Sequence, residues 1–432
     1  MRAHAAASLE RPAAVLALDL GTHKALALAA RQVGDRVLVC GWAERPCAAV
    51  RRGVLVDLEA ARGVLALVLA DAQRTSGLDT RRVVAGVGGA PVRSVRARGS
   101  LRNKIPLVLQ EAHLDRALDA AADIGLPADH EILHVLATGY LVDGARAVKS
   151  PLGMRARNLI AEAAVVTVAS LVLDNLQRVL EDLGYELVGA AAEPLAGARA
   201  GLTEDDRARG AVLVDIGAES TGAAAYRDGV LQGLCSVAAG GAHVTRDLAF
   251  ALQVDLEQAE AVKRRHGAAL AEQASAARRV EIRRGRERLL VSAQTLSQVV
   301  EARMEELLGL VRDGLAAQGA LGLGDRVVLA GGGARLRGSV ELAEQIFAAP
   351  ARVAAPEPCA WREASGDPAC CTALGLVAYA VRGGLLCDER PKAWARAAHR
   401  LRRVLGERAG RGSSRHLGAA PGVASRQVSL SA

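Results

Sequence analysis

The sequence predicts an α/β fold in which two related domains face each other across a cleft, and two observations support this. Residues 211–226 combine an apolar strand that ends in Asp215, a turn at Gly217, and a second apolar strand. The same order of strand, Asp19, Gly21 and strand occurs near the start of the chain. One such hairpin in each half, with a carboxylate at its mouth, indicates a duplicated domain.

Length and composition limit the classes of protein that fit. The 432 residues suit two domains, and 51% apolar residues are enough for packed interiors. A net charge of +8 suits an acidic partner, but with 2% aromatic residues we expect no base-stacking surface and no nucleic acid. The seven cysteines form no CxxC pair and the histidines no metal or triad motif, which argues against a metalloenzyme or triad hydrolase. No apolar run reaches spanning length, and we expect a cytoplasmic protein.

The first half shows an α/β pattern after a leader, residues 1–12, that we expect to be disordered. Strands are predicted at 15–18, 25–30, 36–42 and 83–87, with a helix at 58–74 whose Leu65, Val68, Leu69 and Ala72 share one face. A helix at 171–183, a strand at 186–191 and a helix that begins at Glu193 complete this domain.

Residues 88–167 change in character. Residues 94–101 alternate in polarity and contain many Arg residues. Strands are predicted at 130–135, 140–142 and 161–168, with a helix at 109–124. This pattern indicates a small inserted α+β subdomain.

The second half starts after residues 203–209, which are predicted to be a charged crossover loop. The hairpin at 211–226 is followed by a predicted strand at 230–237 and by helices at 242–251 and 256–265. A basic run at 278–288 is predicted as a loop or strand, and a long amphipathic helix at 294–317 follows it. A short strand at 325–329 and a helix at 340–347 end the pattern.

The glycine turns carry the candidate chemistry. Glycine lets backbone N–H groups approach a triphosphate, and carboxylates set back from the phosphates can hold a cation. Asp19 and Asp215 are placed to hold Mg²⁺, mostly through water. Either turn alone is more typical of an ordinary hairpin. The two in order, followed by Gly240-Gly241 and the segment LAGGGARL at 329–336, favour nucleotide binding.

These motifs resemble those of the actin/Hsp70 ATPase superfamily. The shared segments are ALDLGTHK (17–24), LVDIGAEST (213–221), a Gly-Gly helix start, EAVK (260–263) and LAGGGARLRG (329–338). Within the superfamily the chain resembles the bacterial cell-division FtsA proteins over about residues 15–380. That resemblance rests on GVLVDLE (53–59), ILHVLATGYLVDG (132–144), SPLGMRARNLIAEAAVVT (150–167), AEAVKRRHG (259–267) and QTLSQVVEARMEELLGLV (294–311).

The resemblance implies an actin-like ATPase fold with four subdomains. It assigns 13–87 and 168–205 to the first large domain, and 88–167 to the FtsA-type insertion. It assigns 206–256 and 325–381 to the second large domain, and 257–324 to the second small subdomain. A linker and a basic amphipathic helix at 382–411 and a disordered tail at 412–432 would follow.

The resemblance also implies an ATP and Mg²⁺ site. The matched nucleotide-binding residues are Asp19, Gly21, Thr22, Lys24, Asp215, Gly217, Thr221, Gly240, Gly241, Glu260, Lys263, Gly331, Gly332 and Gly333. Without the resemblance, Glu260 and Lys263 would be interpreted as an exposed ion pair one helical turn apart. The triple glycine would be interpreted as a helix-initiating loop.

Three departures from the family pattern concern the chemistry. The second turn has Ala218-Glu219 where relatives have glycines, Gly222 replaces an expected acidic residue, and Thr138 stands where a water-orienting Gln is expected. Two like charges 4 Å apart repel by roughly 4 kcal/mol at an effective dielectric near 20, so Glu219 would point away, coordinate the metal or weaken binding. We therefore expect weak or absent hydrolysis, and nucleotide acting as a structural ligand.

The C-terminal region and the family together imply a location and a partner. Trp394, Leu401 and Leu405 share one face of an arginine-rich helix, which suits an anionic membrane surface. A helix packed on the body or a nucleic-acid-binding arm are the alternatives. The family implies that the C-terminal peptide of FtsZ docks on the second small subdomain, with Arg303 as a candidate contact near the basic run. A solvated basic face is the other interpretation of that run.

The function predicted from these features is an ATP-binding protein that tethers the FtsZ ring to the cytoplasmic face of the cell membrane and self-associates into dimers or filaments. One alternative is an actin-like protein of pilus assembly, which shares the fold and the insertion. Another is a phosphotransferase of the same superfamily, for which the sequence offers no catalytic Asp base or sugar pocket.

Overall fold

The structure is a computed structural model that describes residues 14–33, 36–148, 150–322, 325–356 and 366–382. All of them lie in one compact unit of the chain. The predicted leader at 1–12, the membrane residues Trp394, Leu401 and Leu405, and the tail at 412–432 lie outside the described residues.

Two five-stranded sheets have the same topology, as the paired hairpins predicted. The first has the order β11-β6-β1-β2-β3 and the second the order β18-β17-β12-β13-β14. In each, the central strand is antiparallel to the next strand along the chain and parallel to the strand on its other side. The first comprises β1 Ala14–Leu20, β2 Lys24–Val33, β3 Arg36–Pro46, β6 Arg82–Val87 and β11 Glu186–Ala192. The second comprises β12 Ala211–Ile216, β13 Thr221–Arg227, β14 Val230–Val237, β17 Arg326–Ala330 and β18 Ala351–Val353.

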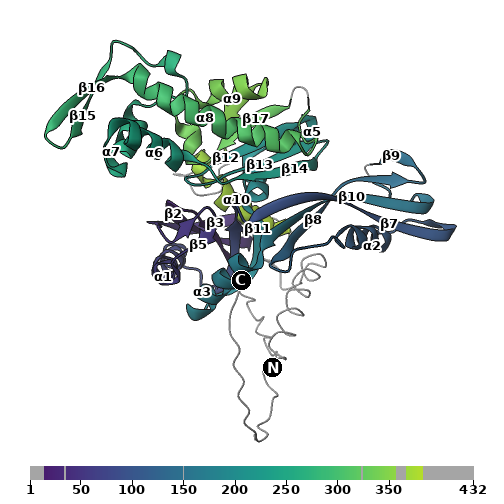
Figure 1. Cartoon of the computed structure of the whole chain (residues 1–432). Coiled ribbons are helices and arrows are strands. Elements are labelled where there is room, and N and C mark those ends of the chain that lie inside the picture. Colours follow the sequence, from purple (N-terminus) through teal and green to yellow (C-terminus); the bar gives the residue numbers. More distant parts are fainter. Residues whose placement is uncertain (1–13, 34–35, 149, 323–324, 357–365, 383–432) are drawn as a thin grey trace, which may run out of the picture. The chain divides into compact units, whose positions relative to one another are not determined.

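Helices α1 (Leu58–Ser76) and α3 (Ser170–Asp182) cover the outer face of the first sheet (Figure 1). Asp57 caps α1 by accepting a hydrogen bond from the Ala60 amide, and Gly77 ends it in the left-handed conformation. The predicted apolar face of α1 is buried, and it packs against Leu176, Val179 and Leu180 of α3. A short hairpin, β4 Val50–Arg51 and β5 Val54–Leu55, precedes α1.

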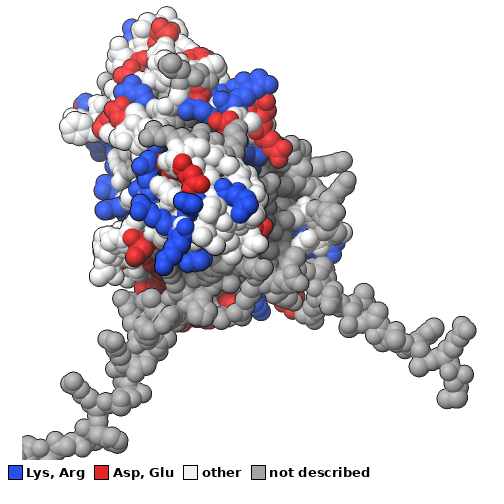
Figure 2. Space-filling view, turned by 90° about the vertical axis from the view of Figure 1, so that its right-hand side faces the viewer, with Lys and Arg blue, Asp and Glu red and all other residues white. Residues whose placement is uncertain are grey.

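The inserted subdomain is a four-stranded antiparallel sheet with the order β7-β10-β8-β9 and one helix, α2 (Glu111–Ala121). Its strands are β7 Val92–Val108, β8 His130–Val142, β9 Ala145–Val148 and β10 Arg155–Ala169. The prediction of separate strands at 130–135 and 140–142 was wrong, because β8 continues through two irregularities in its pairing with β10. Exposed basic residues lie along β7, and Figure 2 shows Lys and Arg side chains gathered on the end of the molecule where this sheet lies.

The outer face of the second sheet is covered by α6 (Gly241–Leu252), α8 (Ala293–Ala316) and α9 (Ser339–Phe347) (Figure 1). Helix α7 (Leu256–His266) packs on α6 and α8. The predicted loop or strand at 278–288 is a hairpin, β15 Arg279–Arg284 and β16 Glu287–Ser292. Three single helical turns are also present, η1 Ala271–Gln273, η2 Gly332–Arg335 and η3 Pro368–Cys370.

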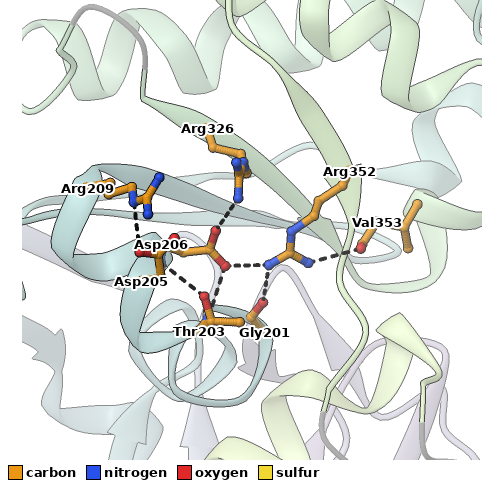
Figure 3. A network of polar contacts seen from close by, with 8 residues as sticks. All are labelled: Gly201, Thr203, Asp205, Asp206, Arg209, Arg326, Arg352 and Val353. Atoms are coloured by element: carbon orange, nitrogen blue, oxygen red, sulfur yellow. Dashed lines mark hydrogen bonds and ion pairs between the residues drawn. The ribbon is translucent and has the colours of Figure 1, made fainter.

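Residues 203–209 are not the loop that their charge predicted. They form helix α5 (Glu204–Arg209), in which the Thr203 side chain accepts from the Asp206 amide at 3.0 Å and the Asp206 carboxylate accepts from the Thr203 amide at 3.0 Å. The buried carboxylate of Asp206 also accepts from Arg326 and Arg352, which ties α5 to β17 and β18 (Figure 3). Burial raises the pKa of Asp206, but the bonds from Thr203 and Arg352 outweigh it, so the net shift is downward.

Two further helices lie against the inner faces of the sheets and contact each other. Helix α10 (Cys371–Arg382) packs on β1, β2 and β6, and α4 (Glu193–Gly201) packs on β12 and β13. Their backbones approach so closely at Gly375 that a Cβ there would lie 1.7 Å from Ala196 O. Helices α4 and α10 therefore connect the two halves of the described unit and lie between their sheets.

Candidate functional site

The two predicted turns are built alike. Gly21 N donates to Lys24 O at 2.9 Å, and Gly217 N donates to Ser220 O at 2.9 Å. Four residues lie between the paired residues Leu20 and Ala25, and four between Ile216 and Thr221, so Glu219 takes the place in the second turn that His23 has in the first.

A cavity of about 1360 Å³ lies between the halves, and both turns line it. It is large enough for a nucleotide. The predicted residues that line it are Asp19, Gly21, Thr22, Lys24, Asp215, Gly217, Gly241, Glu260, Lys263, Gly331, Gly332 and Gly333. Residues that are almost 200 positions apart therefore meet in one site.

Two of the predicted nucleotide-binding residues, Thr221 and Gly240, lie behind the residues that line the cavity. Thr221 is fully buried and its hydroxyl donates to Ala239 O at 2.8 Å. Gly240 packs on the second turn, where a Cβ would lie 2.5 Å from Gly217 O. Both shape the turn from behind and do not face the cavity.

The start of α6 is bonded to the second turn. Gly241 N donates to Gly217 O at 2.9 Å and Ala242 N donates to Ala218 O at 2.7 Å. These first two amides of the helix therefore already have hydrogen-bond acceptors within the protein.

Three carboxyl groups gather where the turns meet, and sequence reasoning missed one of them. Burial, and then the charge of Asp215, raise the pKa of Asp19 to about 7. Burial, followed by Asp19 and Asp215, raises the pKa of Glu193 well above its ordinary value. Burial also raises the pKa of Asp215, although Thr372 donates to its Oδ2 at 2.8 Å. Such a group of carboxyls favours a cation beside it.

Glu193 begins α4, and its signal in the sequence was the Glu-Pro pair after a run of alanines. Thr372 lies on α10 and Arg246 on α6, and both line the cavity. No local pattern distinguishes these two from ordinary helix residues, and only the fold brings them to the turns.

For Glu219 the departure from the family pattern left three alternatives: it points away, coordinates the metal or weakens binding. Its side chain is 4% exposed and pairs with Arg246 and, at 3.4 Å, with Arg51. The two guanidinium groups offset part of its charge, which reduces the repulsion expected for a free carboxylate.

Gly222 lies opposite Asp215 in the β12–β13 register. A Cβ at Gly222 would lie 2.5 Å from Cγ of Pro194, the second residue of α4. An acidic side chain therefore has no room at this position, which accounts for the departure.

Glu260 and Lys263 form the ion pair that their spacing predicted, but it is partly buried. Lys263 Nζ lies 2.6 Å from Glu260 Oε2 and donates to Gly241 O at 3.0 Å. Thr245 Oγ1 lies 2.5 Å from the same glutamate oxygen. The pair joins α7 to the start of α6 and also lines the cavity.

Within the described part of the chain, no group of three or more His, Cys, Asp or Glu residues is arranged to hold a metal ion directly. No helix among these residues is long and apolar enough to cross a membrane.

Comparison with known proteins identifies the family. The family model "Cell division protein FtsA" matches residues 212–375, and the model "SHS2 domain inserted in FTSA" matches residues 89–167. The cell division protein FtsA of Pseudomonas aeruginosa is 33% identical over 386 residues, covering 87% of this chain and 91% of the relative. This chain belongs to the FtsA family.

Other FtsA relatives and solved structures agree with this. FtsA of Neisseria meningitidis is 31% identical, with 79% of this chain and 83% of the relative covered. A PilM-PilN type IV pilus biogenesis complex matches with a TM-score of 0.62 at 17% identity, covering 85% of this chain and 98% of that chain. MreB5 of Spiroplasma citri bound to AMPPNP matches with a TM-score of 0.52 at 15% identity, covering 85% and 96%. These structures confirm the predicted actin-like fold.

One residue that the FtsA resemblance placed at the nucleotide does not lie there. Thr138 sits at an irregularity of β8, where Gly139 pairs with Glu162 and Ala137 with Ala163. It belongs to the sheet of the inserted subdomain and is absent from the cavity lining. The prediction that Thr138 replaces a water-orienting Gln was therefore wrong.

Arg303, the candidate contact for the FtsZ peptide, is engaged within this FtsA protein. From α8 it donates to both carboxylate oxygens of Asp247 on α6, at 2.6 and 3.1 Å, and it also pairs with Glu306. An acidic peptide would have to compete with these carboxylates. Arg283 and Arg286, on the exposed β15–β16 hairpin, are more accessible.

Proposed function

We propose that this FtsA-family protein is an ATP-binding scaffold that tethers the FtsZ ring to the cytoplasmic face of the cell membrane at the division site and self-associates. The observation that carries the proposal is the cavity shared by both halves, in which two glycine turns and two strand-terminal aspartates converge. A ligand held by both halves stabilises their closed arrangement and favours subunit contacts.

In this proposal the two turns bind the phosphates, and Gly331, Gly332 and Gly333 contact the adenosine. Gly331 and Gly333 fit this role because the chain leaves no space for a side chain there: a Cβ would lie 2.3 Å from Asp215 Oδ1 at Gly331 and 2.3 Å from Ile216 Cγ2 at Gly333. Glu260 and Lys263 would contact the ribose and base. Asp19 and Asp215 would hold Mg²⁺ through water, and the ion would supply charge neutralisation of the phosphates.

We further propose that hydrolysis is slow and depends on Glu193. Its buried carboxyl lies with Asp19 and Asp215, where it can orient a water and accept a proton. Burial, and then the charges of Asp19 and Asp215, raise the pKa of Glu193, which disfavours the ionised carboxylate that a general base requires. This reason replaces the one based on Thr138.

Replacing Glu193 with Gln should lower the remaining phosphate release at least about tenfold, because an amide cannot accept the proton. Nucleotide affinity should change less than threefold, since the side-chain shape is kept. Steady-state phosphate release and a nucleotide titration measure the two effects. Glu186→Gln, on an exposed residue at the other end of β11, is the matched control. An unchanged release rate in Glu193→Gln would exclude this role.

The tether itself is tested with vesicles. The full chain should carry purified FtsZ into the pellet with vesicles of anionic phospholipid, and FtsZ without its C-terminal peptide should stay in solution. Leu401→Glu combined with Leu405→Glu should release both proteins, because charges on the apolar face oppose insertion. Deleting 412–432 should have no effect. Equal pelleting of FtsZ with and without this protein would reject the tether.

An actin-like protein of pilus assembly is the second candidate, because a PilM-PilN complex shares the fold. At 17% identity that likeness supports the fold alone, whereas FtsA relatives reach 33%. Loss of FtsZ recruitment with intact nucleotide binding would favour this candidate.

A further inference from the structure

Glu219 links three segments at the phosphate end of the cavity. It lies in the turn between β12 and β13, Arg246 comes from α6 of the same half, and Arg51 comes from β4 of the other half. All three residues line the cavity. The side chain of Glu219 is 4% exposed, whereas those of Arg51 and Arg246 are 63% and 39% exposed. The carboxylate is therefore enclosed, while the guanidinium groups remain open to the cavity and solvent.

The carboxylate is incompletely satisfied where it lies. Both arginines contact Oε1, and no described residue hydrogen-bonds to the buried Oε2. A buried acceptor without a hydrogen-bond partner raises the free energy of the conformation that buries it. Glu219 is thus a weakly held anion between two arginines in the part of the cavity where phosphates are proposed to bind.

Arginine is well suited to a phosphate, since its planar fork donates two parallel hydrogen bonds to adjacent phosphate oxygens. A phosphate that replaced Glu219 would leave the arginines with an anionic partner, so little charge imbalance results. Because Arg51 and Arg246 come from opposite halves, that phosphate would also connect the halves as Glu219 does in the structure.

We propose that Arg51 and Arg246 bind the terminal phosphate of a nucleoside triphosphate, and that Glu219 competes with this phosphate for them. The inference rests on the proposed nucleotide function of the cavity. It makes Glu219 a specificity-determining residue: it weakens all nucleotides that reach the arginines, and it sets the preference for triphosphate over diphosphate. A diphosphate that reaches only the glycine turns would be little affected.

The test is a calorimetric titration of the full chain with MgATP and with MgADP at one ionic strength. Glu219→Gln should bind MgATP about tenfold more tightly and MgADP within threefold of the wild type, because the competing charge is removed. Arg246→Gln and Arg51→Gln should each weaken MgATP at least fivefold and leave MgADP within threefold. The thermal midpoint with saturating nucleotide gives a second readout that does not depend on hydrolysis.

Glu287→Gln is the matched control, because Glu287 pairs with Arg284 on the β15–β16 hairpin and is absent from the cavity lining. An MgATP to MgADP affinity ratio that stays at the wild-type value in Glu219→Gln and in both arginine variants would overturn the inference and leave the nucleotide function standing. A wild type and variants that bind neither nucleotide, while their thermal unfolding is normal, would overturn the nucleotide function and the inference with it.

Discussion

Gly375→Ala is expected to destabilise the protein by about 3 kcal/mol, the upper part of the range for overpacking a tight contact. In an ordinary helix the same change stabilises by roughly 0.5–1 kcal/mol, so the expected sign is reversed. The reason is the contact between α10 and α4, where the added Cβ would lie 1.7 Å from Ala196 O, a backbone atom that cannot rotate away. The urea midpoint of unfolding measures the effect.

Gly309→Ala provides the control for this prediction. Gly309 lies inside α8, and a Cβ there meets no atom within 4 Å. It should therefore show the ordinary gain of a helical alanine. If both variants shift the midpoint in the same direction, the close approach of α4 and α10 is not as described.

Gly331→Ala should weaken nucleotide binding about tenfold or more, which corresponds to the 1–3 kcal/mol typical of backbone strain at a site. Gly331 has a φ of 78°, and its Cβ would lie 2.3 Å from Asp215 Oδ1 and 2.5 Å from Ile216 O. Alanine would thus displace the aspartate and the strand end that carry the second turn. A nucleotide titration, with thermal unfolding measured in parallel, separates loss of binding from loss of fold.

Gly332→Ala is the matched control, since a Cβ at Gly332 meets nothing within 4 Å. It should unfold at the wild-type temperature. Equal thermal shifts in the two variants would contradict the assigned geometry of this turn.

Most of the fold could be predicted from the sequence, because apolar periodicity is a local signal. The helix at 58–74 is an example: its four predicted apolar residues are all buried in α1. Helix α5 was missed because its six residues are charged or small, and so they contain no apolar residues at helical spacing. Its cause is the exchange of hydrogen bonds between Thr203 and Asp206, which follows the capping-box pattern with Asp in place of Glu or Gln.

The candidate site was predictable only where its residues follow a strand directly. Asp19 and Asp215 could be located because each ends an apolar run before a glycine turn. Thr221 was placed at the nucleotide by the family resemblance, but its hydroxyl donates to Ala239 O, an acceptor 18 residues further along the chain. Glu193 joins the two aspartates through the packing of α4, which no spacing in the sequence encodes.

The hydrogen bonds at the start of α6 connect the second turn to the helices that cover the second sheet. Because the Gly241 and Ala242 amides donate to the carbonyls of Gly217 and Ala218, the second turn is fixed to the first residues of α6. Further along α6, Asp247 is clamped to Arg303 on α8. The second turn is therefore connected to α8 by two sets of polar contacts, one at the start of α6 and one at Asp247.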